Sequence, residues 1–180
     1  MLKRTAALAL AITAAALPAK ADTVSDFYKG KNIQLVVGYG PGGGYDIYAR
    51  LIARFIGKHV PGSPNVVVQN VPGGGGLVAA NKLYNTSERD GSVISLIQRG
   101  TMQVQIQGNA NAKFDPQKFT WLGSLSSYAD DGYLLVVMAS SPVKSIEDAR
   151  KMKINLGGVG VGATNTTFAL ISKELLGVNT

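Results

Sequence analysis

Short apolar runs alternate with amphipathic stretches through the first part of the chain. Residues 31–37, 65–69 and 92–98 are apolar runs of the length of a strand. Residues 46–56 and 77–84 lie between them, and their apolar positions recur every three or four residues, as on one face of a helix. Strands that alternate with helices predict an α/β fold with a largely parallel sheet and right-handed crossovers.

The helix expected at residues 46–56 is amphipathic. Asp46 is its expected N-cap and Gly57 its expected end, and His59 follows, where we interpret it as a favourable partner of the helix C-terminus. The apolar face consists of Ile47, Tyr48, Leu51, Ile52, Phe55 and Ile56, and the basic residues Arg50, Arg54 and Lys58 lie opposite.

The pattern changes after residue 114. Residues 119–123, 133–138 and 153–156 are expected strands. A crossover at residues 140–144 is expected to divide the chain into a first lobe, residues 22–140, and the start of a second, residues 141–180. The second lobe holds one strand and two helices, which is too little to enclose a core of its own.

Two helices are expected in the second lobe. Residues 145–148 read Ser-Ile-Glu-Asp, which fits a capping box opening a short helix to about Met152. The last helix is expected to begin with Thr164 or Asn165 as its cap and to end at Gly177.

Glycine-rich turns follow the strands. The sequence Val-Val-x-x-x-Pro-Gly-Gly-Gly occurs at residues 36–44 and again at residues 67–75, and a third glycine turn covers residues 157–162. The repeat has the length of one strand–helix unit, so the first two turns are expected at the same end of adjacent strands, where open α/β sheets bind ligands. Backbone N–H groups at such turns suit a carboxylate or phosphate, although Pro-Gly-Gly-Gly is also ordinary turn chemistry.

The N-terminus has the pattern of a cleavable signal peptide. Lys3 and Arg4 precede an apolar run at residues 5–17, and Ala19-Lys20-Ala21 fits a signal-peptidase site. The run is too short to span a bilayer, although an N-terminal anchor is the alternative. Cleavage after Ala21 lowers the net charge from +7 to +4, so we expect a periplasmic protein that binds no nucleic acid.

Composition excludes several kinds of site. The chain has no cysteine and one histidine, so neither a zinc site nor a thiol nucleophile is expected. Gly38-x-Gly40-x-x-Gly43 matches the dinucleotide fingerprint, but no acidic residue ends the second strand to bind a ribose. No Gly-x-x-x-x-Gly-Lys motif and no nucleophile elbow occurs. We therefore expect no cofactor, no metal and no catalysis.

Several motifs together resemble the Bug (TctC-type) receptors, the solute-binding components of tripartite tricarboxylate transporters. They are Asn32-Ile33-x-Leu35-Val36-Val37, Pro41-Gly42-Gly43-x-x-Asp46-x-x-Ala49-Arg50, Val67-x-x-Asn70-x-Pro72-Gly73-x-Gly75 and Asp90-Gly91. The resemblance covers roughly residues 31–177. It implies a two-lobed, periplasmic-binding-protein-like (Venus flytrap) α/β fold that binds a small carboxylate, without chemistry, between its lobes. It also implies membrane permease subunits as partners, and we expect a monomer.

The resemblance also implies where a ligand binds. The two Pro-Gly-Gly turns of the first lobe would hold one carboxylate, and the glycine turn at residues 160–165 would hold the distal end of the ligand. Arg99 stands in a turn where the family has serine or threonine, and it adds either a bidentate carboxylate contact or a solvated cation. The expected ligand-binding residues are Tyr39, Pro41, Gly42, Gly43, Gly44, Asp46, Pro72, Gly73, Gly74, Gly75, Gly76, Arg99, Thr101, Gly162, Thr164 and Asn165.

Family members are considerably longer than this chain. We therefore expect either a fragment of a longer protein or a truncated product within the second lobe. Two alternatives stay open: a non-binding remnant that acts as a sensor or adaptor piece, and an exported hydrolase of small anions that uses Asp46 or Asp90 as a base.

Overall fold

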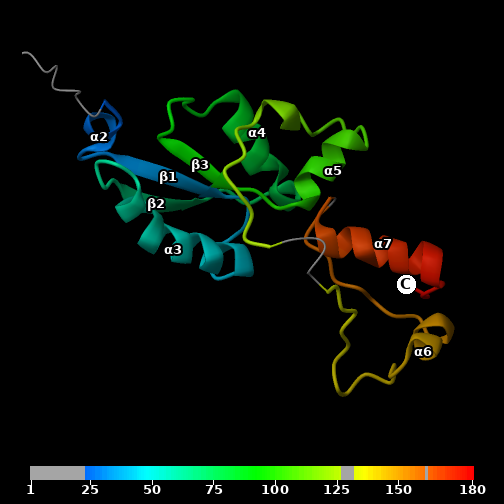
Figure 1. Ribbon diagram of the computed structural model, residues 1–180. Helices are drawn as coiled ribbons and strands as arrows, with labels where there is room; N and C mark the ends of the chain where they lie inside the picture. The colour runs from blue at the N-terminus through cyan, green and yellow to red at the C-terminus, as the bar shows by residue number, and fades with distance from the viewer. Residues whose placement is uncertain (1–22, 127–131, 161) are drawn as a thin grey trace, which may run out of the picture.

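A three-stranded parallel sheet forms the centre of the computed structural model, which describes residues 23–126, 132–160 and 162–180 (Figure 1). Its strands are β1 (Asn32–Val37), β2 (Asn65–Asn70) and β3 (Val93–Leu96), in the order β2-β1-β3. Asn32 pairs with Asn65 and Gln34 with Val93, so the carboxyl ends of the strands share one edge. The three predicted strands and the α/β class with a parallel sheet are therefore confirmed.

Helices precede, connect and follow these strands. The α-helices are α2 (Thr23–Tyr28), α3 (Gly44–Ile56), α4 (Leu77–Asn85), α5 (Gly100–Ile106), α6 (Ile146–Lys151) and α7 (Thr164–Leu176), and 3-10 turns lie at Gly57–His59, Gly74–Gly76 and Pro116–Lys118. The sequence did not predict α5, because the apolar residues Met102, Val104 and Ile106 alternate as they do in a strand.

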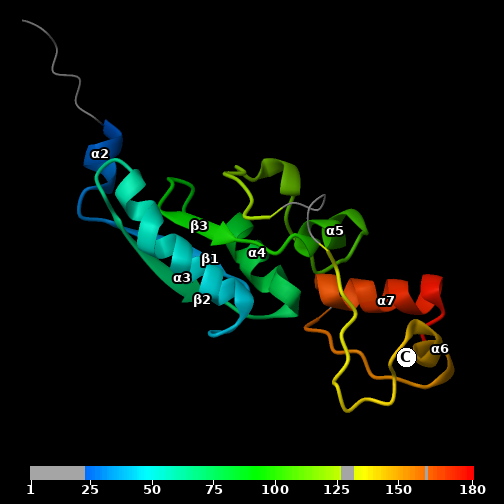
Figure 2. The same cartoon turned by 60° about the horizontal axis from the view of Figure 1, so that its bottom comes forward.

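The two connecting helices cover opposite faces of the sheet (Figures 1 and 2). On one face Leu35 and Val37 of β1 pack against Ala49 of α3. The other face is covered by α4, and Leu77 and Ala80 of this helix share a core with Val104, Phe114 and neighbouring aromatic residues. Chain order β1-β2-β3 with β1 in the middle requires this arrangement, because right-handed crossovers that run in opposite directions leave the sheet on opposite faces.

The predicted apolar face of α3 is wrong in part. The buried residues of α3 are Asp46 and Ala49, and Ile52 and Ala53 pack beside Ala49. Four residues of the predicted apolar face are instead exposed, namely Ile47, Tyr48, Leu51 and Phe55. Because alanine side chains are small, α3 lies close to the sheet with its alanines facing it. The larger apolar residues of the helix consequently face solvent.

The predicted caps of α3 and α7 are also wrong. The N-cap of α3 is Gly43, and Asp46 lies inside the first turn, from which its side chain reaches back to the loop. The N-cap of α7 is Ala163, so the helix begins at the expected cap Thr164. The predicted helix ends are confirmed, since Gly57 is the C-cap of α3 and Gly177, which is left-handed, is the C-cap of α7. The chain continues from Gly57 into a 3-10 turn.

The C-terminal part of the chain, residues 132–180 without residue 161, has a small core of its own, so the expectation that residues 141–180 are too few to enclose one is wrong. Val143, Ala149 and Val178 are buried together. The predicted capping box is confirmed, since the Ser145 side chain accepts from the Asp148 N–H and the Asp148 side chain accepts from the Ser145 N–H. This box fixes the start of α6.

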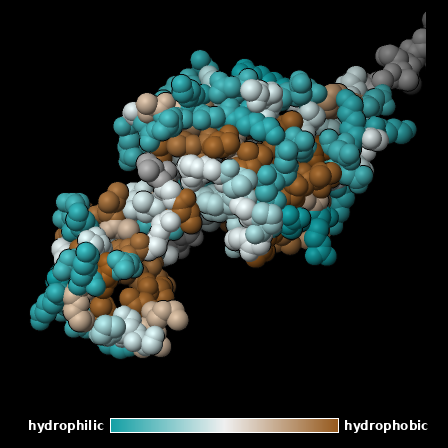
Figure 3. Space-filling model, turned by 180° about the vertical axis from the view of Figure 1, so that it is seen from behind, coloured by the Kyte–Doolittle hydropathy of each residue, from teal (hydrophilic) through white to brown (hydrophobic). Residues whose placement is uncertain are grey.

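The strands predicted at residues 119–123, 133–138 and 153–156 are wrong, since all three segments are irregular. A strand requires a neighbour that pairs with its N–H and C=O groups along its length, and none of the three forms such a ladder in the described part of the chain. The Ile154 N–H donates to the Asn179 carbonyl at 2.9 Å, and this single bond does not make a strand. Residues 133–138 consequently keep apolar side chains in solvent, with Leu134 86% exposed. Hydrophobic surface is visible on this part of the chain as well as on the N-terminal part (Figure 3).

The predicted signal peptide lies outside the described residues and stays a prediction. Within the described ranges, no helix has both the length and the apolar character needed to cross a membrane.

Candidate ligand site

The first two glycine turns lie side by side at the carboxyl ends of β1 and β2. The Tyr39 hydroxyl donates to the Gly75 carbonyl at 3.3 Å, and Asn70 Nδ2 donates to the Tyr39 carbonyl at 2.9 Å. Gly38 packs directly on the second turn, because a methyl group there would lie 2.8 Å from Gly76 Cα. The internal repeat therefore predicted this neighbourhood correctly.

Asp46 ties the two turns together. Its carboxylate accepts hydrogen bonds at 2.9 Å from the Gly42 N–H, from Arg50 Nε and from Asn70 Nδ2. The residue is 3% exposed, so these bonds lie largely out of solvent. With three donors on its two oxygens, Asp46 shapes the first turn and anchors it to the end of β2.

The same contacts shift the titration of this group. The hydrogen bonds from Arg50, Gly42 and Asn70 hold the pKa of Asp46 well below its usual range. Tyr39 shifts the other way, because burial raises its pKa to about 12, with a smaller contribution from Tyr45. The two tyrosine rings stack with centroids 4.8 Å apart. Tyr39 is therefore a neutral hydrogen-bond donor at physiological pH.

The third glycine turn reaches the second one. A methyl group on Gly160 would lie 3.0 Å from the Gly75 N–H nitrogen. Gln98 Nε2 donates to the Gly162 carbonyl at 3.0 Å. A methyl group on Gly162 would also collide with Val104, and one on Gly100 with the Gly162 carbonyl, so the two backbones can meet only where neither has a side chain.

Buried polar atoms without partners surround this junction. Gln98 and Thr101 are 3% and 1% exposed, yet Gln98 Oε1 and Thr101 Oγ1 make no hydrogen bond within the described residues. The hydroxyl of Thr164, beside Gly100, is in the same state, whereas the equally unpaired hydroxyl of Thr166 lies against Gly158. Buried polar atoms in folded proteins are normally paired, so these atoms are candidate partners for a water or a ligand.

Arg99 lies beside the junction and is engaged by the chain itself. Its guanidinium carbon lies 5.3 Å from the centre of the Tyr133 ring, which in turn stacks on Phe168 of α7 with centroids 4.3 Å apart. This arrangement is a cation–π contact followed by an aromatic stack. It links α5 to α7, which the sequence did not predict.

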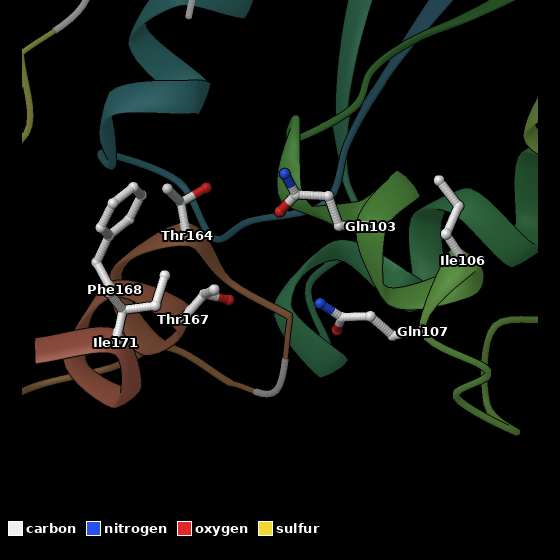
Figure 4. A pocket seen from close by; sticks show the side chains of 7 residues that line it. All are labelled: Gln103, Ile106, Gln107, Thr164, Thr167, Phe168 and Ile171. Atoms are coloured by element: carbon white, nitrogen blue, oxygen red, sulfur yellow. The ribbon is translucent and has the colours of Figure 1, made fainter. Parts of the chain in front are cut away.

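A groove of about 350 Å³ lies between α5 and α7 (Figure 4). Gln103 of α5 and Gln107, the C-cap of this helix, direct their amides toward the start of α7, where Thr164, Thr167 and Phe168 face them. Of the residues expected to bind ligand, Thr164 alone lines it. The remaining walls are Ile106 and Ile171, so the groove carries no charged side chain.

The expected ligand-binding residues fall into two groups in the structure. Those close to the junction of the turns include Tyr39, Gly75, Gly76, Thr101, Gly162 and Thr164. Those at exposed positions on the outer turns are Pro41, Gly42, Gly43, Gly44, Pro72, Gly73 and Gly74. Asn165 is also exposed and accepts from the N–H of Thr166. Whether they bind a ligand stays a prediction.

Three polar residues of the site, Arg50, Asn70 and Gln98, were not among the expected ligand-binding residues, although Arg50 and Asn70 belong to the motifs of the resemblance. Arg50 follows Asp46 by one helical turn, a spacing typical of an ion pair. Asn70 ends β2 beside the Pro-Gly turn, and Gln98 follows β3 in the same way. Polar residues directly after strands of a parallel sheet were the available signal. No group of three or more potential metal ligands occurs within the described ranges.

The chain is similar to a protein of a known sequence family. It is 32% identical over 174 residues to the "UPF0065 protein in gbd 5'region" of Cupriavidus necator, and the match covers 94% of this chain and 50% of the relative. UPF0065 is the Bug family, so the similarity supports the motif-based resemblance at this coarse level. The chain thus spans about half the length of the curated relative that it matches. No family model matches the chain.

Proposed function

We propose that this chain contributes the ligand-binding turns of a periplasmic receptor that captures a small carboxylate for a tripartite tricarboxylate-type transporter. The observation that carries the proposal is the meeting of three glycine turns at the carboxyl edge of the sheet, where Gly75 lies beside both Tyr39 and Gly160. Similarity to the Bug family supports a solute-binding role in general, with a small ligand and membrane partners.

The first turn has the chemistry of an anion site. It leads into α3, a helix of 13 residues whose cap, Gly43, contributes no side-chain hydrogen bond. Methyl groups on Gly40, Gly42 or Gly44 would meet nothing within 4 Å, so the space in front of these glycines is open. The first N–H groups of a helix carry partial positive charge, and a carboxylate is bound there without a cationic side chain.

Binding rather than catalysis is the function that this site supports. The carboxylate of Asp46, one of the two candidate bases, is occupied by three hydrogen bonds with a depressed pKa. Asp90, the other, accepts from Ser92 in an exposed turn. Neither is poised near neutral pH as a general base requires. Relationship to the Bug family likewise favours a binding protein.

Calorimetric titration of a pair of isosteric variants tests the anion site. Gly44 lies in the first turn of α3 in open space, so either Asp or Asn is accommodated there. We expect Gly44→Asp to weaken carboxylate binding at least tenfold relative to Gly44→Asn, since the added charge repels the ligand. The helix itself is not destabilised, because an acidic residue favours its N-terminus.

The comparison has a clear negative outcome. Equal affinity of the Asp and Asn variants, with both folded by circular dichroism, would show that no anion binds in front of this turn. Absence of binding by the unmodified protein, across di- and tricarboxylates, amino acids and aromatic acids, would reject the receptor function and favour the remnant.

A further inference from the structure

The side chain of Gln98 is held in one orientation at the junction of the turns. Its Nε2 donates to the Gly162 carbonyl at 3.0 Å. The reversed amide would set two oxygens against each other, so this hydrogen bond assigns nitrogen and oxygen. Oε1 is consequently the unpaired atom, and the residue is 3% exposed.

An amide oxygen accepts hydrogen bonds and cannot donate them. A ligand carboxylate or carbonyl placed against Gln98 Oε1 would therefore be repelled, whereas a hydroxyl or ammonium group would be bound. The neighbouring Thr101 Oγ1, which is also unpaired, can either donate or accept, so it adapts to the partner. Gln98 is therefore the residue of the site that distinguishes a ligand with a hydrogen-bond donor from a ligand with acceptors only.

The position of Gln98 relates it to the carboxylate-binding turns. A methyl group on Gly100 would lie 2.7 Å from Gln98 Nε2 and 3.3 Å from Thr164 Oγ1, so both side chains meet at the start of α5. A methyl group on Gly76 would lie 3.3 Å from Thr101 Oγ1. The unpaired atoms thus lie between the second and third glycine turns.

We propose that the ligand of this site is a carboxylate that also carries a hydrogen-bond donor, a hydroxyl or an ammonium group, and that Gln98 Oε1 accepts from this donor. The inference rests on the proposed receptor function and narrows its ligand class. An ordered water could occupy the same place, and in that case the donor on the ligand would bring no advantage.

Two sets of matched ligands test the inference by calorimetry on the purified protein. Succinate, malate and aspartate differ at one carbon by hydrogen, hydroxyl and ammonium, and phenylacetate, mandelate and phenylglycine differ in the same way. We expect malate or aspartate to bind at least tenfold more tightly than succinate, or the corresponding preference in the aromatic set. Comparison of malate with aspartate, or of mandelate with phenylglycine, shows whether a hydroxyl or an ammonium group is recognised.

Variants assign the preference to Gln98. Gln98→Met removes the acceptor with little change in side-chain length, and we expect it to reduce the preference to less than threefold. The matched control is Gln105→Met, because Gln105 is a partly exposed glutamine of the adjacent helix α5 that does not line the groove, and this variant should keep the preference. If Gln98→Met does not fold, the ligand comparison on the unmodified protein still decides.

Each outcome bears on a separate claim. Equal binding of donor-bearing and donor-free ligands, or a preference unchanged in a folded Gln98→Met protein, overturns the inference and leaves the receptor function standing. If the protein binds only carboxylates that lack a hydrogen-bond donor, the inference is likewise overturned and the receptor function stands. Binding of no carboxylate overturns both.

Discussion

At the scale of single residues, Asp46 shapes the first turn through hydrogen bonds within the chain. Its carboxylate accepts from the backbone of the first turn, from its own helix and from the end of β2. These bonds favour the charged form and hold the pKa of Asp46 well below its usual range. The folded state therefore holds fewer protons than the unfolded state in mildly acidic solution.

The first prediction follows from this pKa. An unfolded aspartate titrates near pH 3.9, so the stabilisation by Asp46 is present above about pH 4 and is lost as pH falls through the lower folded pKa. We expect Asp46→Asn to lower the melting temperature by several degrees at pH 7, and the difference from the unmodified protein to shrink below about pH 4. Thermal melts from pH 2 to 7 measure this.

A control separates Asp46 from the general effect of acid. Asp26→Asn changes an exposed carboxylate of α2, and its melting curve should follow that of the unmodified protein. A difference between Asp46→Asn and the unmodified protein that does not depend on pH would contradict the hydrogen-bonded, low-pKa carboxylate.

A second prediction concerns the contact between the first two turns. A methyl group on Gly38 would lie 2.8 Å from Gly76 Cα, so Gly38→Ala should push the turns apart and destabilise the fold by about 1–3 kcal/mol. Gly40→Ala, two residues away in open space, should be neutral or stabilising by up to about 1 kcal/mol. Urea unfolding measures the free energy of unfolding of both variants. Equal stability would mean that the turns do not touch.

At the scale of elements, the local patterns predicted what local chemistry determines. The strands at β1 and β2, the capping box of α6 and the glycine end of α7 follow from residues close in sequence, and they are found where they were expected. The strand at residues 133–138 was predicted by the same reasoning and is absent. Its apolar composition favours a strand, but pairing depends on a distant neighbour that the pattern does not specify.

The outward face of α3 shows a similar limit. Periodicity identified a face of large apolar residues, whereas the buried face contains Asp46 and Ala49. A buried aspartate is invisible to a hydrophobic pattern, because its burial depends on donors from Asn70 and the Gly42 backbone. Polar networks of this kind also explain why Gln98 was missed.

The third prediction tests packing in the C-terminal part. Val143 is 4% exposed in the small core with Ala149 and Val178, so Val143→Ala should cost about 1–3 kcal/mol. Leu134 lies in solvent, and Leu134→Ala should change stability by less than about 0.5 kcal/mol. Hydrogen exchange at α6 and α7 amides reports the local loss. A larger effect at Leu134 than at Val143 would show that residues 133–138 are packed.

At the scale of the whole molecule, contacts between distant segments create the site. The N-terminal part supplies two glycine turns, and the C-terminal part brings the third against Gly75 and Gln98. The stack of Arg99, Tyr133 and Phe168 joins the same two parts on the side of α5 and α7. The sequence predicted the turns, but their meeting depends on tertiary contacts of glycine backbones.

The most direct test of this account is a map of amide chemical shifts in labelled protein during titration with whichever of succinate, malate or aspartate binds most tightly. We expect the largest changes at the N–H groups of all three turns, including those of Gly44, Gly75 and Gly162. Changes confined to the groove between α5 and α7, or to one turn alone, would contradict the claim that the three turns form a single carboxylate site.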